Sequence, residues 1–308
     1  MSALLAADRH ASRFGLVCEK GSPMPKIALD DFDAHYLTVG RGPDVVMIHG
    51  LLGNLAMWHL EIVPKLRSQF RITTYDLRGH GYSRMTDSGY GPSTLATDLE
   101  RLMDAWDIDR AALVGHSLGA DVCLHFALKY RHRVSRIVAI EPTVASLLPR
   151  QLPDDWSGWG DWARKLEELG FPVPPERRRD IRFLIELSLQ VPRLHGPFKG
   201  LPRNRKSLVA LMSSTTLMKE CLAVDGLTPE TIPTITTPTL LIYGDQSPLL
   251  GSYEFLRSSL PHCEAVLLRN TQHFAPLEQP ADSADHIRDF LTGPAHRAAS
   301  EASGVTWQ

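Results

Sequence analysis

The segment Gly115-His116-Ser117-Leu118-Gly119 has the pattern G-x-S-x-G, in which glycines stand two positions to either side of a serine. The apolar run Ala111–Val114 precedes it, and a helical pattern from Ala120 to Tyr130 follows it. A serine on such a tight strand-to-helix turn is held in a strained conformation that exposes its hydroxyl above the sheet. The hydroxyl then lies at a helix N-terminus, where backbone N–H groups favour negative charge. We predict that Ser117 is a nucleophile.

A second glycine-rich segment, His49-Gly50-Leu51-Leu52-Gly53, directly follows the apolar run Val45–Ile48. Acyl transfer builds negative charge on the substrate oxygen, and preorganised N–H donors stabilise that charge. We expect the backbone N–H groups of Leu51 and Leu118 to form this oxyanion hole. Taken by itself, the segment could equally be a glycine turn that only ends a strand.

A third segment, Asp76-Leu77-Arg78-Gly79-His80-Gly81-Tyr82-Ser83, follows the run Arg71–Tyr75. Together the three segments resemble the α/β-hydrolase family, specifically its members with a helical cap, over about residues 27–291. The resemblance implies a serine hydrolase of the esterase or thioesterase type. It also implies that the third segment has a structural role beside the active site and no catalytic one.

A serine hydroxyl needs a general base within hydrogen-bond reach, and thirteen histidines compete for that role. In the family the base lies in a loop after the last strand, within a pattern like G-H-F-x-x-x-E-x-P. The segment 272–280 matches this pattern, with Gln272 in place of the glycine. The resemblance therefore implies that His273 is the base. It implies neighbouring or structural roles for three other histidines, which are His49, His80 and His116.

The acid that orients the histidine is the point at which the sequence departs from the family pattern. The family places this acid after the strand that precedes the last one, in a string such as G-x-x-D. Here the string Gly244-Asp245-Gln246-Ser247 puts Ser247 at that position. Asp245 lies two residues too early, whereas Glu141 follows the run Ser135–Ile140, after which some relatives, certain haloalkane dehalogenases included, carry their acid. We predict Glu141 as the acid and Asp245 as the second candidate. A polar strand end facing the cap is the alternative for Glu141.

Short apolar runs that alternate with helical patterns predict the elements that position these residues. The predicted strands are His35–Val39, Val45–Ile48, Arg71–Tyr75, Ala111–Val114, Ser135–Ile140, Thr239–Tyr243 and Ala265–Leu268. The predicted helices are Met57–Arg67, Ser93–Trp106, Leu118–Tyr130, Ser252–Ser259 and Ala281–Leu291. The fold class is thus α/β, an α/β-hydrolase fold with a mostly parallel sheet flanked by helices and a helical cap inserted between two strands.

The rhythm of strands and helices divides the chain into four parts. Residues 26–144 and 237–292 are expected to form the core, and residues 145–236 a helical cap that lies over the site as a lid. Residues 1–25 are expected to be an N-terminal extension and residues 293–308 a flexible tail. The expected cap contains three tryptophans spaced by three, for which we favour core packing over a ligand cage. They are Trp156, Trp159 and Trp162.

Charge is unevenly distributed along the chain. The whole chain has 33 basic and 35 acidic side chains, and this near balance gives no indication of a nucleic-acid or membrane-surface partner. Residues 176–219 of the expected cap nevertheless carry ten basic and three acidic side chains, a local charge of +7. A solvated helix face with extended basic side chains is one interpretation. Attraction of an anionic substrate, or of an acidic carrier protein bearing a thioester, is the other.

The remaining features bound the cellular setting. No apolar run reaches the roughly 18 to 20 residues that cross a bilayer, and the segment Met1–Pro25 has too short an apolar stretch for a secretory signal. The four cysteines form no C-x-x-C pair. We therefore expect a cytoplasmic protein with reduced cysteines, without a metal site or a cofactor.

The predicted reaction is hydrolysis of a small-molecule acyl substrate, an ester or thioester, through an acyl-enzyme on Ser117. Dehalogenases and epoxide hydrolases of the family carry aspartate at this position, so a serine argues against their chemistry. Three alternatives stay open: a carbon–carbon bond hydrolase, a biosynthetic lyase or cyclase, and a non-catalytic ligand-binding protein. The sequence does not specify an oligomeric state.

Overall fold

The computed structural model describes residues 25–51, 53–147, 158–188, 190 and 205–293, and its central element is an eight-stranded sheet. The strands are β1 (Lys26–Ala28), β2 (Asp33–Val39), β3 (Asp44–Ile48), β4 (Arg71–Tyr75), β5 (Ala111–His116), β6 (Val134–Ile140), β7 (Thr239–Gly244) and β8 (Cys263–Leu268). Their order in the sheet is β1-β2-β4-β3-β5-β6-β7-β8. Strand β2 runs antiparallel to both of its neighbours, and every other pair is parallel.

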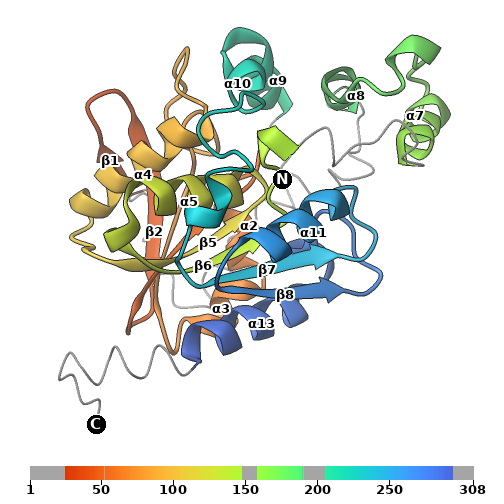
Figure 1. Ribbon diagram of the computed structural model, residues 1–308. Coiled ribbons are helices and arrows are strands. Elements are labelled where there is room, and N and C mark those ends of the chain that lie inside the picture. The colour runs from red at the N-terminus through yellow and green to blue at the C-terminus, as the bar shows by residue number, and fades with distance from the viewer. Residues whose placement is uncertain (1–24, 52, 148–157, 189, 191–204, 294–308) are drawn as a thin grey trace.

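Helices cover both faces of this sheet (Figure 1). The helices that precede β6 or follow β7 in the chain are α2 (Ala56–His59), α3 (Ile62–Leu66), α4 (Pro92–Ala105), α5 (Leu118–Lys129), α11 (Leu250–Ser259), α12 (Ala275–Glu278) and α13 (Pro280–Thr292). Successive residues of one strand pack on opposite sides, as the pleat requires. In β3, Val46 and Ile48 pack in one core with α4, α5 and α11, while Val45 and Met47 pack in the other with α3 and α13. The inner parallel strands β3, β5, β6 and β7 are thus buried on both faces, which explains their nearly continuous apolar sequences.

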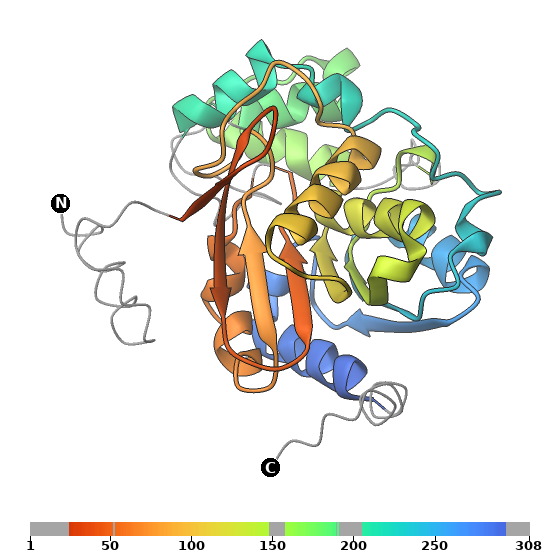
Figure 2. The same ribbon diagram turned by 90° about the vertical axis from the view of Figure 1, so that its left-hand side faces the viewer.

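The described part of the chain between β6 and β7 is helical. Its helices are α7 (Gly158–Glu168), α8 (Ile181–Ser188), α9 (Arg205–Ser214) and α10 (Leu217–Glu220), with short 3-10 turns at Ala145–Leu147, Pro175–Arg177 and Ile232–Thr234. Figure 2 shows these helices beyond the carboxyl ends of the parallel strands. Trp159 is buried with Leu166 and Leu184, and Trp162 packs against that group, which supports core packing for both tryptophans. Trp156 lies outside the described residues.

The structure agrees with the predicted fold class and with all seven predicted strands. The observed strand ends differ from the predicted ones by no more than two residues. Strand β1 and helix α12 were missed because elements of three and four residues show no period. The predicted helix Met57–Arg67 is wrong as a single helix, since the chain breaks it into α2 and α3. Pro64 is the physical reason, because proline lacks an N–H and fits only the first turn of a helix that restarts just before it. The expected extension and tail fall almost wholly outside the described residues.

Candidate active site

The turn between β5 and α5 carries Ser117 and has the geometry of a nucleophile-bearing turn. Ser117 has φ 52° and ψ −120°, a conformation that non-glycine residues rarely adopt. The glycines on either side are required by close backbone approach. A Cβ on Gly115 would lie 2.2 Å from the carbonyl oxygen of Gly119, and a Cβ on Gly119 would lie 2.2 Å from that of Ile48. The chain can therefore turn sharply enough to place the serine side chain at the strand end.

His273 follows β8 and faces this serine. Its Nε2 lies 3.0 Å from Oγ of Ser117, which is within hydrogen-bond reach. Two residues hold the histidine loop: Glu278 accepts the N–H groups of both neighbours of His273, and Nε2 of His116 donates to the backbone oxygen of His273 at 2.8 Å. Burial lowers the pKa of the His273 imidazole to about 4, against an opposing effect of the Glu278 charge. The imidazole is thus kept neutral, the form that can accept a proton.

Glu141 directly follows β6 and reaches the other nitrogen of the imidazole. Its Oε2 lies 3.3 Å from Nδ1 of His273. The carboxyl group is fully buried and accepts two further hydrogen bonds, from the N–H of Gly244 at 2.6 Å and from the hydroxyl of Ser247 at 2.5 Å. Burial raises the pKa of Glu141 to about 8, although both of these hydrogen bonds act to lower it. Like Ser117, Glu141 is a non-glycine residue at positive φ, here 52°.

Strand order explains why this glutamate lies so close to the serine. In the register of β5 and β6, His116 pairs with Ile140, and the N–H of Ser117 donates to the carbonyl oxygen of Ile140 at 2.8 Å. Ser117 and Glu141 are therefore the next residues on two neighbouring parallel strands, which are about 4.8 Å apart. The imidazole of His273 lies between their side chains.

The structure does not bring Asp245, the second candidate acid, to the histidine. Asp245 is exposed, and its Oδ1 accepts the N–H of Thr271 at 3.3 Å. Within the described residues no hydrogen bond or ion pair joins it to His273. Its side chain stabilises the loop that leads to the histidine instead.

The two candidate oxyanion donors lie on either side of the serine. Leu118 begins α5, where the first N–H groups of a helix have no partner inside the helix. Leu51 follows Gly50, and a Cβ on Gly50 would lie 3.0 Å from Cβ of Ser117, so this loop passes directly beside the serine. Leu52 lies outside the described residues. The backbone of both loops thus borders the space next to the hydroxyl.

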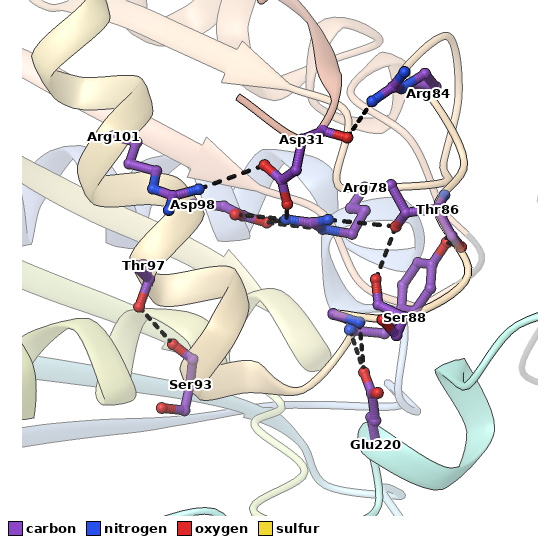
Figure 3. A network of polar contacts seen from close by, with 12 residues as sticks. Asp31, Arg78, Arg84, Thr86, Ser88, Ser93, Thr97, Asp98, Arg101 and Glu220 are labelled. Atoms are coloured by element: carbon purple, nitrogen blue, oxygen red, sulfur yellow. Dashed lines mark hydrogen bonds and ion pairs between the residues drawn. The ribbon is translucent and has the colours of Figure 1, made fainter. Parts of the chain in front are cut away.

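The D-x-R-G segment forms a buried polar network beside the site. Asp76 accepts a hydrogen bond from Nδ1 of His35 at 2.6 Å and from the N–H groups of Leu55 and Tyr82. Arg78 lies between two carboxylates, at 2.6 Å from Asp31 and 2.8 Å from Asp98 (Figure 3). None of these side chains forms a hydrogen bond with Ser117 or His273 in the described part of the chain, and the network ties the loop after β4 to α4.

The helices beyond the strand ends supply an apolar roof. Leu211, Leu217 and other buried side chains of α9 and α10 pack in one cluster with Phe274, the neighbour of His273, and Leu51 packs against that cluster. Glu220 of α10 anchors this roof, because its Oε2 accepts the N–H groups of Gly89 and Tyr90 (Figure 3). A cavity of about 130 Å³ beside Leu51 and Phe274 is bordered mainly by apolar side chains. They include Leu51, Met57, Leu60, Phe274 and Leu277.

Several residues around the site were missed in the sequence. Ser247, which stands at the position where the family pattern has an acid, is a hydrogen-bond donor to Glu141, and Glu278 holds the histidine loop. Asp121 and Thr143 lie beside the serine and the glutamate. The glutamate of the G-H-F-x-x-x-E-x-P pattern was visible in the sequence, whereas Asp121 carried no signal there.

Among the described residues, no helix combines the length and the apolar character that a membrane crossing requires. The same residues contain no group of three or more histidine, cysteine or carboxylate side chains that could hold a metal ion.

Comparison with known proteins places these features in a wider group. A model of the alpha/beta hydrolase fold matches residues 43–280. A pimeloyl-[acyl-carrier protein] methyl ester esterase from Vibrio vulnificus is 26% identical over 275 residues, with 84% of this chain and 98% of that protein covered. A soluble epoxide hydrolase from Corynebacterium sp. is 31% identical over 113 residues, and this chain spans only 39% of its length. A carboxylesterase from Bacillus subtilis has the same fold, with a TM-score of 0.68 at 20% identity over 94% of this chain and 97% of that one.

Proposed function

Because the chain belongs to the alpha/beta hydrolase fold family, we propose that it hydrolyses a carboxylic ester or thioester through an acyl-enzyme on Ser117. The observation that carries the proposal is the position of His273. Its Nε2 lies 3.0 Å from the serine oxygen while its Nδ1 lies 3.3 Å from the carboxyl group of Glu141. A nucleophile, a base and an acid that orients the base are the parts that acyl transfer needs.

The reaction follows from these positions. Oγ of Ser117 attacks the acyl carbon while Nε2 of His273 takes the serine proton, and the backbone N–H groups of Leu51 and Leu118 stabilise the oxyanion. The imidazolium then gives its proton to the leaving alcohol or thiol, and the acyl-enzyme remains. Water repeats the sequence in the second half: it loses a proton to His273, attacks the acyl carbon and releases the acid and the free serine.

Glu141 acts electrostatically in this reaction. Its carboxyl group is removed from water, so its attraction to a nearby cation is stronger than it would be at the surface. Because the pKa of Glu141 is about 8, its ionised form becomes more populated as the pH rises towards 8, and it is this form that stabilises the imidazolium of His273 and keeps Nδ1 protonated. Asp245 has no comparable position, because it is exposed and bound to the backbone of Thr271.

The apolar surroundings favour an apolar acyl or alkyl group on the substrate. The roof formed by α9 and α10 contacts Phe274 and Leu51, which flank the base and the oxyanion loop. The cavity of about 130 Å³ beside Leu51 is bordered mainly by apolar side chains. Apolar pockets with a few convergent polar groups are the usual form of small-molecule sites.

Two substitutions and one label test this function. Ser117→Ala should abolish turnover of a p-nitrophenyl ester and stoichiometric labelling by a fluorophosphonate. Glu141→Gln should lower kcat about 100-fold or more, because the imidazolium loses its counter-charge. The matched control Asp245→Asn should stay within about threefold of the unchanged protein, as substitutions at exposed sites usually do. Full activity of Glu141→Gln combined with loss in Asp245→Asn would reverse the choice of acid, and absence of labelling at Ser117 would refute the hydrolase mechanism.

A second candidate concerns what carries the acyl group. Residues 176–219 hold a local charge of +7, and the Vibrio relative bears the name of an esterase that acts on an acyl-carrier protein. Arg177, Arg178 and Arg179 are exposed; Arg177 forms an ion pair with Asp180, and Arg178 forms one with Glu167. Other basic residues of the segment lie outside the described residues. These are Arg193, Lys199 and Arg203.

A salt titration separates the two interpretations of this charge. For an anionic or carrier-bound ester, kcat/KM should fall severalfold between low and high ionic strength, because salt screens exposed charges beyond about 10 Å. A neutral ester of the same acyl group serves as the control and should change little. Equal salt dependence of the two esters would support the other interpretation, in which the basic residues form a solvated face and do not attract the substrate.

A further inference from the structure

The turn that carries Glu141 contains two residues in an unfavourable conformation. Residues 141–144 follow β6, and both Glu141 (φ 52°) and Val144 (φ 43°) have positive φ although neither is glycine. Such conformations persist only where the surrounding structure imposes them. Something other than local preference must therefore hold this turn in place.

Asp121 of α5 is the group that holds it. Its Oδ1 accepts the N–H of Thr143 at 2.8 Å and the N–H of Val144 at 3.0 Å. Asp121 is 2% exposed, and burial raises its pKa to about 7. It lies one helical turn after Ser117, and its own N–H donates to the carbonyl oxygen of that serine at 3.1 Å. A buried carboxyl group with these contacts is costly to keep, and the reaction described above does not use it.

The turn is tied to its surroundings at every residue. Tyr243 of β7 donates a hydrogen bond from its hydroxyl to the carbonyl oxygen of Pro142 at 3.3 Å. The hydroxyl of Thr143 lies 3.4 Å from Oγ of Ser117. Gly244 and Ser247 bind the carboxyl group of Glu141. Among these ties, the two to Asp121 are the ones that come from the helix that begins at the nucleophile.

We propose that Asp121 is a positioning residue, which sets the distance from Glu141 to His273 by holding the backbone of residues 143 and 144 against α5. The inference rests on the proposed function, because it matters only if Glu141 acts on the histidine. It means that one helix, α5, fixes both the serine at its start and, through Asp121, the turn that presents the acid. Without Asp121, Glu141 would lose the fixed backbone that keeps its side chain within reach of Nδ1.

A double-mutant cycle tests this role. Asp121→Ala should lower kcat about tenfold or more with KM within about threefold, since it disturbs the histidine and not substrate binding. Asp121→Asn keeps an oxygen that can accept both N–H groups, and should retain most of the activity. In a Glu141→Gln background, Asp121→Ala should cost less than about twofold further, because residues that act through one another are not additive.

The control is His125→Ala, which removes another buried polar side chain of α5 without a hydrogen bond to residues 141–144. It should destabilise the protein with little change in kcat. If Asp121→Ala does not fold, Asp121→Ser replaces it, because the shorter side chain stays polar but cannot reach both N–H groups.

The outcomes separate this inference from the proposed function. A loss that is equally large in the Glu141→Gln background, or an unchanged kcat in Asp121→Ala, would overturn the positioning role while leaving the hydrolase mechanism intact. Full activity of Glu141→Gln itself would refute Glu141 as the acid and the inference with it.

Discussion

The hydroxyl oxygen of Ser247 lies 2.5 Å from Oε2 of Glu141, and the same carboxyl oxygen lies 3.3 Å from Nδ1 of His273. Ser247 also accepts the N–H of Leu249 at 3.0 Å, so its single proton is directed at the glutamate. Ser247 follows β7 and Glu141 follows β6, so a hydroxyl group and a carboxyl group from two neighbouring strand ends meet beside the histidine.

The first prediction concerns that hydrogen bond. Ser247→Ala should lower kcat about tenfold, because the substitution leaves a buried carboxyl oxygen without this donor, at a cost of roughly 1–3 kcal/mol, and frees Glu141 to shift. Steady-state kinetics on a p-nitrophenyl ester would measure the effect. Ser258→Ala, which removes an exposed hydroxyl of α11, is the matched control and should leave kcat unchanged. Equal rates for the two variants would mean that Ser247 does not support the acid.

The second prediction moves the acid between the two strand ends. Glu141→Ala should be nearly inactive, and adding Ser247→Asp to it should restore part of the lost kcat, because a carboxylate returns to the neighbourhood of Nδ1. Ser247→Asp alone should be less stable than the unchanged protein, since two buried carboxyl groups would then lie within about 3 Å of each other. Activity of the double variant no higher than that of Glu141→Ala would show that β7 no longer offers a workable acid position.

The third prediction concerns the loop of the base. Glu278 accepts the N–H groups of Gln272 and Phe274 with its two oxygens, so it fixes the backbone on both sides of His273. Glu278→Ala should lower kcat about tenfold by leaving the imidazole less well oriented. Glu278→Gln retains one acceptor oxygen and should lose less. Glu254→Ala, at an exposed glutamate of α11, provides the comparison; a loss there of the same size would point to a general effect on stability.

The fourth prediction is a pH dependence of stability. The pKa of Glu141 is about 8 in the folded protein and near its ordinary value of 4.5 in the unfolded chain, so folding retains a proton that unfolding releases. The stability that this proton contributes is present below about pH 4.5 and is lost as the pH rises through about 8. Glu141→Gln cannot ionise at this position. The free energy of unfolding of Glu141→Gln, relative to that of the unchanged protein, should therefore increase from pH 5 to pH 8.

Urea unfolding of both proteins at these two pH values would measure the difference. The pKa of Asp121 is also raised, but it contributes to both proteins alike and cancels in the comparison. Parallel stability curves for the two proteins would contradict the raised pKa of Glu141.

The sequence predicted the sheet well because its inner strands are buried on both faces and their apolar runs are nearly continuous. Ser117 and the histidine segment could be located because their patterns depend on local turn geometry, which a short sequence encodes. The meeting of Glu141 with His273 depends instead on β6 lying next to β5, and on a side-chain direction that no local pattern specifies. For the same reason Asp245 looked equivalent in sequence, although its side chain turns to Thr271.

The contacts of Asp121 could be predicted even less from the sequence. In the sequence it is one polar residue in an apolar helix, and its partners are the N–H groups of residues 22 and 23 positions away. The break between α2 and α3 was in principle visible, because Pro64 cannot continue a helix that begins at Ala56.

The position of Glu141 in the chain also affects which changes of sequence the site can tolerate. Both Ser117 and Glu141 precede the segment 145–236, whose described part is helical, whereas an acid placed after β7 would follow that segment. Insertions, deletions or wholesale replacement within that segment would therefore leave the spacing of 24 positions from the serine to the glutamate untouched. Substrate preference could be revised by exchanging the roof as a cassette, in evolution or in the laboratory, while the two residues and the pair of strand ends that present them stay in register.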